Sequence, residues 1–529
     1  MQKFSIINPS GNHQRNDKIN NPLLSRVFSE LRINRILHMT PIYTGGRITS
    51  PNVMDYFTAD IETIRHRLDI FEDLLKCDGI IELFKDIVIP AIRDILLQTD
   101  SLDSGEFYFI SQFHTVNRLK TYISCIQNLH EAFAKLTFES KGLRNFSEKI
   151  ATIYNSDEFN NLISNLSKMS EHLKKTIKSV TVGINLNKDM SIGDIGIVSI
   201  NEKRYKAGSV LDKILKADLS PKDQYSLLTP VESVHKGLDL SGAEKHQLDR
   251  NFKNALNTLL KGATKKIPNE IASYMKHQIQ FLQNLTSEIC FLVAGHEMLT
   301  GLKNRRVPIC KPAISQTNNT YIKNLYHPSL LETIKLDDLV NNSVSFDENG
   351  MIYILTGANS GGKSVFLHSV GVAQVLFQLG LYVPASEACM LPVDHLCIHL
   401  PTDASIHNSS GRLEQECIAM NEISSIVTSQ SLVLIDEIFS STSVHDGSIL
   451  LEMLIKHFSR IGCKGLFSTH IHGLPVDRIN KDEKADVKVD TLVAITEEGK
   501  RTYKISRQKP EGLSHAMDIA KKYGLLVDM

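Results

Sequence analysis

The residues best suited to chemistry form one glycine-rich run: Gly357-Ala358-Asn359-Ser360-Gly361-Gly362-Lys363-Ser364. The run fits the pattern GxxxxGK(S/T) at every fixed position. Phosphate is bound by backbone N–H groups that turn inward, and glycines permit this close approach. A helix that begins near Lys363 would favour negative charge at its amino end. The pattern therefore predicts a nucleotide-phosphate site, with Lys363 reaching the β and γ phosphates and Ser364 binding magnesium.

Two carboxylates, Asp436 and Glu437, directly follow the mostly apolar run 431–435. Two carboxylates directly after a buried strand are costly unless they serve a bound group. Downstream of a phosphate loop, Asp436 would hold a metal-bound water and Glu437 would polarise the attacking water. A third apolar run, 465–468, leads to His470, which is placed to sense the γ-phosphate. Together the three segments predict a Mg²⁺-dependent ATPase.

The elements that position these residues alternate between strands and helices from about Gly350 onward, beginning with the strand 352–355. Such alternation predicts an α/β fold with a mostly parallel sheet. Prolines and polar residues in 308–325 predict a linker before it. The stretch 389–400 alternates after Pro392, which indicates ordinary strand residues rather than a zinc site built from Cys389, His395, Cys397 and His399.

The upstream part of the chain has a different period. Apolar residues recur at three- and four-residue steps in 60–179 and again in 271–292, which predicts long helices. Between them, the β-branched segments 179–187 and 195–205 alternate and predict a short antiparallel unit. The order is therefore long helix, small β unit, long helix.

Composition bounds the class of protein. A chain of 529 residues predicts two to four domains at roughly 100 to 200 residues each. No apolar run reaches the roughly 18 residues of a membrane span. Lys plus Arg and Asp plus Glu balance at 59 each, so any nucleic-acid binding must come from local patches. Eight cysteines without a CxxC pair favour the reducing cytoplasm.

Taken in order, these segments resemble the ATPase of the MutS family, a branch of the ABC-type P-loop NTPases. The resemblance is specific because many short motifs occur in one order. They are His327-Pro328, Val340-Asn341-Asn342, the Gly357–Ser364 loop, Tyr382-Val-Pro-Ala385, Asp436-Glu437-Ile438, Thr442-Ser443, Asp446-Gly447 and Ser468-Thr469-His470, followed by a closing strand and helix in 503–525.

The resemblance extends upstream and implies a multidomain fold, with an all-α core and lever helices, a small β clamp element and an α/β P-loop ATPase domain. The implied domains are 1–35, unassigned; 36–179, helical core and first lever; 180–207, small β clamp-like element; 208–325, second lever and return to the core; and 326–529, ATPase.

The resemblance also implies roles for individual residues. Glu437, His470 and Lys363 would be catalytic, and Ser364 and Asp436 would hold Mg²⁺. Ser409 and Ser410, in the position of the family's signature loop, would approach the ATP of a partner subunit. The residues that would contact ATP are Gly357, Ala358, Asn359, Ser360, Gly361, Gly362, Lys363, Ser364, Val365 and Asn342.

Several features depart from the family pattern. The segment 408–414 lacks the signature loop's aromatic and methionine, and Phe439-Ser440-Ser441 replaces a glycine- and arginine-containing turn. Both changes are expected to slow turnover without abolishing ATP binding. No counterpart of the mismatch-recognition domain, the connector or the terminal dimerisation helices is expected, and Phe28-Ser29-Glu30, which mimics a mismatch-reading wedge, is expected to pack within a helix.

The resulting prediction is a cytoplasmic MutS-related ATPase. As a homodimer it would close on mismatched, branched or distorted DNA when ATP binds and release it after hydrolysis, in repair or recombination and with other repair proteins as further partners. The altered signature loop motivates an alternative, a nucleotide-gated scaffold with weak hydrolysis that acts on a protein or on ribosomal RNA. A transporter-type ATPase is disfavoured because no membrane-spanning segment is predicted.

Overall fold

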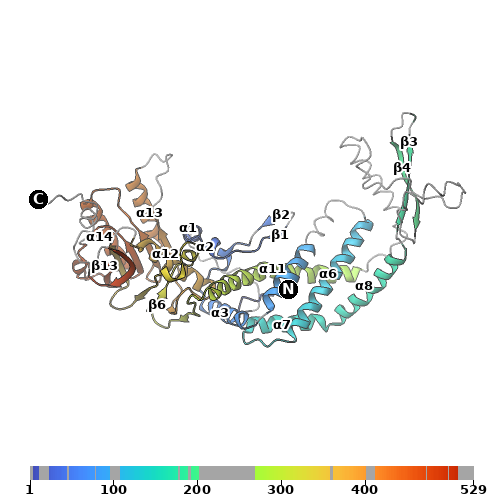
Figure 1. Cartoon of the computed structure of the whole chain (residues 1–529), viewed down its shortest axis with the longest axis horizontal. Coiled ribbons are helices and arrows are strands. Elements are labelled where there is room, and N and C mark those ends of the chain that lie inside the picture. Colours follow the sequence, from blue (N-terminus) through green and yellow to red (C-terminus); the bar gives the residue numbers. More distant parts are fainter. Residues whose placement is uncertain are drawn as a thin grey trace.

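The molecule is elongated (Figure 1), with a six-stranded sheet at one end and the paired strands β3 (Ser179–Leu186) and β4 (Ile192–Asn201) at the other. Within the part that is described, no helix is long and apolar enough to cross a membrane. The computed structural model describes residues 4–10, 23–44, 47–49, 51–77, 79–95, 108–176, 179–186, 188, 192–201, 269–357, 361–400, 411–471, 474–497 and 500–509.

Some predicted features lie outside the described residues. They are the first part of the predicted second lever, 208–268; Ala358, Asn359 and Ser360 of the glycine-rich loop; Ser409 and Ser410; and the predicted closing helix beyond residue 509. The clamp and lever assignments, which rest on family resemblance, stay predictions.

The six-stranded sheet has the order β10-β11-β12-β8-β13-β14. All neighbouring strands run parallel except β14, which is antiparallel to β13. Strands β8, β11 and β12 are buried along their full length, as parallel strands covered on both faces must be, and this explains their unbroken apolar runs. The predicted mostly parallel α/β sheet is confirmed. The strands are β8 (Ile352–Gly357), β10 (Leu396–His399), β11 (Leu432–Asp436), β12 (Lys464–Ser468), β13 (Val489–Glu497) and β14 (Lys500–Arg507).

Helices connect the strands of this sheet. The first begins at Lys363, directly after the glycine-rich loop, as the sequence predicts. The helix before β12 is capped by Ser443, whose hydroxyl accepts a hydrogen bond from the Asp446 N–H at 3.1 Å. The helices are α12 (Lys363–Leu379), α13 (Arg412–Ile426), α14 (Val444–Ile461) and α15 (Val476–Ile479).

A second, four-stranded sheet has the order β5-β9-β6-β7 and corrects two expectations. The segment 308–325 was predicted as a linker but contributes β5 and β6, so the predicted boundary at 325/326 falls between two paired strands. Prolines and polar residues obscured these strands because both are short. The elements are β5 (Ala313–Ile314), β6 (Thr320–Leu325), η3 (Pro328–Glu332), η4 (Leu336–Asp338), β7 (Asn342–Phe346) and β9 (Glu387–Met390).

The structure also differs from the prediction in the stretch 389–400. Cys389 lies in β9 of the small sheet, whereas Cys397 and His399 lie in β10 of the large one. The predicted alternation is wrong for β10, whose residues are all buried. The reason is tertiary: helix α1 (Leu24–Glu30) packs against β10 and covers it. Phe28 of α1 is buried, which confirms its predicted role in packing.

Long helices fill the middle of the molecule, as predicted (Figure 1). The longest, α11 (Asn269–Asn304), has 36 residues and spans roughly 54 Å at roughly 1.5 Å per residue. The remaining elements are α2 (Ile33–Ile36), β1 (Ile42–Thr44), β2 (Arg47–Thr49), η1 (Val53–Tyr56), α3 (Ile61–Lys76), α4 (Ile80–Leu83), the π-helical η2 (Phe84–Val88), α6 (Tyr108–Phe133), α7 (Lys141–Tyr154) and α8 (Asp157–Thr176).

Arg67 of α3 joins the helical part to the nucleotide end. Its guanidinium is buried and donates to the backbone carbonyls of Ile7 at 3.3 Å, Leu379 at 3.4 Å and Tyr56. Burial lowers its pKa to about 10, so the group stays protonated at neutral pH. Gly380 permits this approach, because a Cβ there would lie 2.4 Å from the Arg67 Cβ. The carboxyl end of α12 is thereby fixed to α3.

The N-terminal segment closes the same joint. Glu288 of α11 is fully buried and accepts hydrogen bonds from the Ser5 hydroxyl and the Ile6 N–H, both at 2.8 Å. The ring Nε2 of His66 lies 2.9 Å from the Ile6 carbonyl oxygen. These contacts tie the segment to α11 and α3 together.

The first testable prediction concerns Arg67→Ala. This change leaves buried carbonyl oxygens without a donor, and we expect it to lower the free energy of unfolding by about 3 kcal/mol. Urea unfolding followed by circular dichroism measures the effect. Arg65→Ala, an exposed arginine of the same helix, is the matched control. Equal urea midpoints for the two variants would contradict the role of Arg67 as the joint.

Candidate nucleotide-binding site

The phosphate loop connects the centre of the large sheet to α12. It leaves β8 at Gly357, which has φ +124°, and enters the helix after Gly362, which has φ +92°. Side chains are disfavoured at both backbone conformations. At Gly357 a Cβ would also lie 2.8 Å from the carbonyl oxygen of Ala494 in β13. Glycine is therefore required at both ends, and the predicted strand–loop–helix order is confirmed.

The side chain of Lys363 folds back onto the phosphate loop that precedes it. Its side chain is buried, and its Nζ donates to the Gly357 carbonyl at 3.0 Å. Burial lowers the pKa of Lys363, and the nearby Glu437 and Asp436 act in the opposite direction. The ammonium group is thus already placed at the loop, close to two carboxylates.

Asp436 and Ser468 end adjacent parallel strands and face each other in register. Asp436 is 3% exposed, and its Oδ1 has no hydrogen-bond partner among the described residues; neither has the Ser468 Oγ. A buried carboxylate oxygen without a partner is costly, and a bound cation relieves that cost. With the partly buried Ser364 at the start of α12, this donor set is all oxygen, which Mg²⁺ prefers.

Glu437 and His470 form a pair. The Glu437 Oε1 lies 2.5 Å from the His470 Nε2, and both side chains are partly exposed. Glu437 has φ +49°, an uncommon conformation for a residue with a side chain, and its N–H donates to the Ser468 carbonyl at 3.0 Å. The sequence predicted each residue for the site separately, but not the contact between them.

A cavity of about 800 Å³ opens beside the phosphate loop. Six of the predicted residues line it, namely Asn342, Gly362, Lys363, Ser364, Val365 and Glu437. Gly357, Gly361, Asp436 and His470 do not. Sequence reasoning assigned no site role to the rest of the lining, which comes from 325–340, from Phe366 and Ser369 of α12, and from 501–503. Only the His327-Pro328 pair and the Val340–Asn342 motif pointed to the first of these segments.

His327 contributes a neutral ring to this lining. Burial, together with the positive charge of the neighbouring His368 of α12 when that ring is protonated and of Arg32, lowers its pKa to about 4. The two rings lie 6.2 Å apart between centroids. At neutral pH the imidazole is therefore uncharged, and its Nδ1 accepts a hydrogen bond from the Ser329 N–H at 3.2 Å.

Asn342 uses its side chain to hold β14 over the loop. Its Nδ2 donates to the Tyr503 carbonyl at 3.0 Å, and its Oδ1 accepts from the Ile505 N–H at 2.7 Å. Tyr503 has φ +58° and lies over Gly362, where a Cβ would be 3.6 Å from its ring. The predicted contact between Asn342 and ATP stays a prediction, whereas its bond to β14 was not foreseen.

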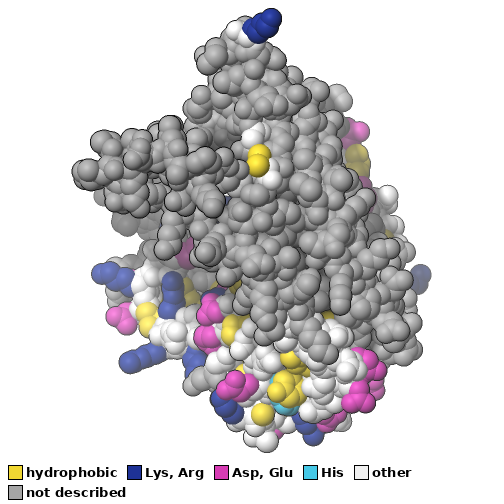
Figure 2. All heavy atoms as spheres, turned by 90° about the vertical axis from the view of Figure 1, so that its right-hand side faces the viewer, with side chains coloured by type: hydrophobic (Ala, Val, Ile, Leu, Met, Phe, Trp, Pro, Cys, Tyr) yellow, Lys and Arg dark blue, Asp and Glu magenta, His cyan; other side chains and the backbone are white. Residues whose placement is uncertain are grey.

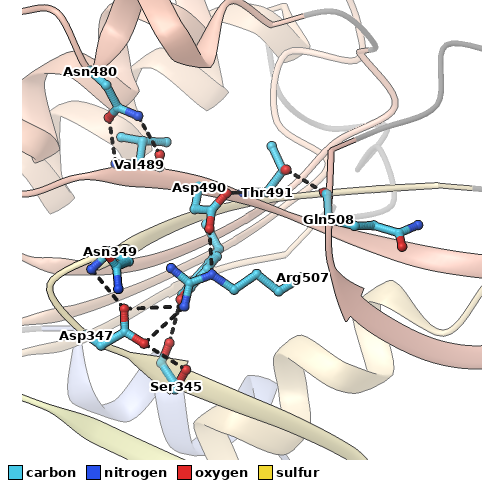
Figure 3. Close-up of polar contacts among 10 residues, drawn as sticks. Ser345, Asp347, Asn349, Asn480, Val489, Asp490, Thr491, Arg507 and Gln508 are labelled. Carbon is cyan, nitrogen blue, oxygen red and sulfur yellow. Dashed lines mark hydrogen bonds and ion pairs between the residues drawn. The ribbon is translucent and has the colours of Figure 1, made fainter.

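Arg507 fixes the far end of β14, as Figure 3 shows. Its Nε donates to the Asp490 carboxylate at 2.5 Å and its Nη1 to Asp347 at 3.0 Å. The guanidinium also lies 5.3 Å from the ring centroid of Tyr353. Burial alone would raise the pKa of Asp347, but hydrogen bonds from Arg507 and other donors outweigh it and lower that pKa. These bonds hold β14 against β13 and β7, and so keep Tyr503 at the cavity.

The fold and the site together define a phosphate-loop nucleotide-binding protein of the α/β class. Two family models match the chain, MutS domain V over residues 353–527 and the MutS2 N-terminal domain over residues 59–305. The first span contains Lys363, Asp436, Glu437 and His470. The chain belongs to the MutS family, which confirms the resemblance found in the sequence.

Curated relatives are similar over part of their length. The chain is 24% identical over 363 residues to the DNA mismatch repair protein MutS of Lactobacillus delbrueckii subsp. bulgaricus, covering 68% of this chain and 39% of that protein. It is 33% identical over 192 residues to the DNA mismatch repair proteins MutS of Bacillus thuringiensis and Bacillus cereus, covering 36% of this chain and 21% of theirs. The matched part of the chain therefore spans well under two thirds of the length of these relatives.

A second prediction follows from the placement of Lys363. We expect Lys363→Met to weaken ATP binding roughly 10- to 100-fold, because it removes a charged hydrogen-bond donor from the loop. Equilibrium titration with a fluorescent ATP analogue in Mg²⁺ measures the dissociation constant. Lys335→Met, an exposed lysine outside the cavity lining, is the control and should bind like the parent. Unchanged affinity in Lys363→Met would place the nucleotide elsewhere.

Proposed function

We propose that the chain binds ATP with Mg²⁺ at this cavity and hydrolyses it. One observation carries the proposal: a buried lysine, a buried carboxylate oxygen without a partner and a Glu–His pair converge on one phosphate loop. These are the positive charge, metal ligand and base that phosphoryl transfer to water requires. The match to MutS domain V over the same residues supports it.

Each side chain has a distinct part in the proposed reaction. Lys363 exchanges its bond to the Gly357 carbonyl for one to the phosphates. Mg²⁺, held by Ser364 and Asp436, supplies neutralisation of phosphate charge when bound. Glu437 orients the attacking water and accepts its proton through the carboxylate oxygen that His470 leaves free. His470 holds that carboxylate in place.

We further propose that nucleotide state moves the helical arm of a homodimer. Helix α12 begins at Lys363, and at its other end the Gln378 Nε2 donates to the Thr58 carbonyl at 3.0 Å. One rigid helix thus runs from the phosphate loop to the joint at which α3 and α11 meet. Ser409 and Ser410 of the partner subunit would approach the γ-phosphate, so that ATP binding closes the dimer and hydrolysis releases it.

Mismatched, branched or distorted DNA in repair or recombination is the proposed ligand of this dimer. The names of the matched relatives support DNA mismatch repair. Among the described side chains on the face that Figure 2 presents, acidic and basic groups are interspersed. Recognition by DNA shape and backbone contacts, rather than by a single basic face, fits this distribution. The altered segments 408–414 and 439–441 favour a second candidate, a nucleotide-gated scaffold with slow hydrolysis that binds a protein or ribosomal RNA.

A third prediction tests hydrolysis. We expect the parent to release phosphate from ATP in Mg²⁺, and Glu437→Gln to lower kcat roughly 10²- to 10⁴-fold while it keeps ATP affinity, because only the base is lost. Steady-state phosphate release measures kcat. The exposed Glu483→Gln is the control and should match the parent. ATP binding without phosphate release in the parent would instead favour the scaffold.

A fourth prediction tests the ligand. We expect the parent with ATP and Mg²⁺ at physiological salt to bind mismatched DNA or a four-way junction roughly tenfold more tightly than homoduplex, and to lose this preference without nucleotide. Fluorescence anisotropy measures the affinities. Lys363→Met should lose the preference even when ATP is present. Equal binding to all three DNA forms, or binding to none, would favour the protein or RNA partner.

A further inference from the structure

The two segments in which this chain departs from its family's pattern contact each other. Helix α13 begins at Arg412, within the altered signature segment, and lies at the α/β end of the molecule (Figure 1). Its Glu416 is 6% exposed, and the Oε2 accepts hydrogen bonds from the Phe439 N–H at 3.0 Å and the Ser441 hydroxyl at 3.4 Å. Arg412 donates from Nη2 to the Ser440 hydroxyl at 3.3 Å.

The Phe439–Ser441 turn needs such support. Glu437 has φ +49° and Phe439 has φ +58°, so two residues with side chains adopt left-handed backbone within one turn. This conformation is costly when a Cβ is present and persists only where the surroundings hold it. The bond from the Phe439 N–H to Glu416 acts on the strained residue itself.

Arg412 and the neighbouring helix complete the support. The Arg412 Nε donates to the Glu416 Oε1 at 3.2 Å, so the carboxylate is fixed from both sides. On the opposite side of the turn, a Cβ at Gly447 would lie 3.0 Å from the Phe439 carbonyl oxygen, so α14 packs closely against it. The turn is therefore held between α13 and α14, two residues after Glu437.

We propose that Glu416 is a positioning residue for Glu437, a role that rests on the proposed ATP hydrolysis. By holding Phe439 in its left-handed conformation, Glu416 fixes the direction in which the Glu437 carboxylate leaves β11 and meets His470. Arg412 orients Glu416. The start of α13 thereby holds the turn within one subunit.

Kinetics test this role through a split between rate and affinity. Glu416→Ala should lower kcat for ATP roughly 10- to 100-fold, since a small displacement of the base is enough, while the ATP dissociation constant stays within about twofold of the parent. Glu416→Gln keeps an acceptor oxygen for the Phe439 N–H and should recover most of the rate. Glu422→Ala, an exposed glutamate of the same helix, is the control. A parallel loss of ATP affinity in Glu416→Ala would overturn the proposal.

Histidine-selective NMR provides a readout that does not need turnover. The ring Cε1–Hε1 resonance of His470 is assigned by its loss in His470→Gln. In Glu416→Ala it should move toward its position in Glu437→Gln, and in Glu422→Ala it should stay at the parent position. An unmoved resonance in Glu416→Ala, even with a lower unfolding temperature, would assign a merely structural role and overturn the proposal. A parent that lacks phosphate release contradicts the proposed hydrolysis alone, because the resonance still decides the role of Glu416.

Discussion

The hydrogen bonds of the buried Arg67 to backbone carbonyls are the constraint on which the arrangement of the molecule depends. Arg67 bonds to Ile7, Tyr56 and Leu379, which come from three separate segments. A charged group that is fully buried among carbonyl oxygens cannot move without losing its partners, so these segments move together. Since α12 ends at Leu379 and begins at Lys363, the phosphate loop and the helical part share one rigid element.

Burial has opposite consequences at the two ends of α12. At the joint, the buried Nε and Nη1 of Arg67 donate to carbonyl oxygens of the chain. At the phosphate loop, Asp436 keeps an oxygen without a partner among the described residues, and the Lys363 ammonium donates to the neutral backbone carbonyl of Gly357. The charge of Arg67 is therefore bonded within the chain, whereas the charged groups Asp436 and Lys363 at the loop are placed to bind a ligand.

Sequence patterns predicted the local features of the site and missed those made by distant segments. Lys363, Asp436 and Glu437 were found because the glycine loop and the apolar strands have short, regular patterns. The long helices were found for the same reason. The bond of Asn342 to β14 joins residues 163 positions apart, at Ile505, and leaves no local signal. Likewise β10 lost its alternation because α1, more than 360 positions away, covers it.

Gln378 connects the helical part to the strand that precedes the segment expected to reach the partner subunit. Its Nε2 donates to the Thr58 carbonyl of the helical part and to the Val393 carbonyl, and its Oε1 accepts from the Val393 N–H at 3.2 Å. Val393 precedes β10, the strand that leads into residues 401–410. One fully buried amide therefore links the arm, the phosphate-loop helix and the strand that precedes the signature segment. A rotation of the arm at Thr58 therefore moves α12 and the start of the segment before β10 together, because both are bonded to the same buried amide.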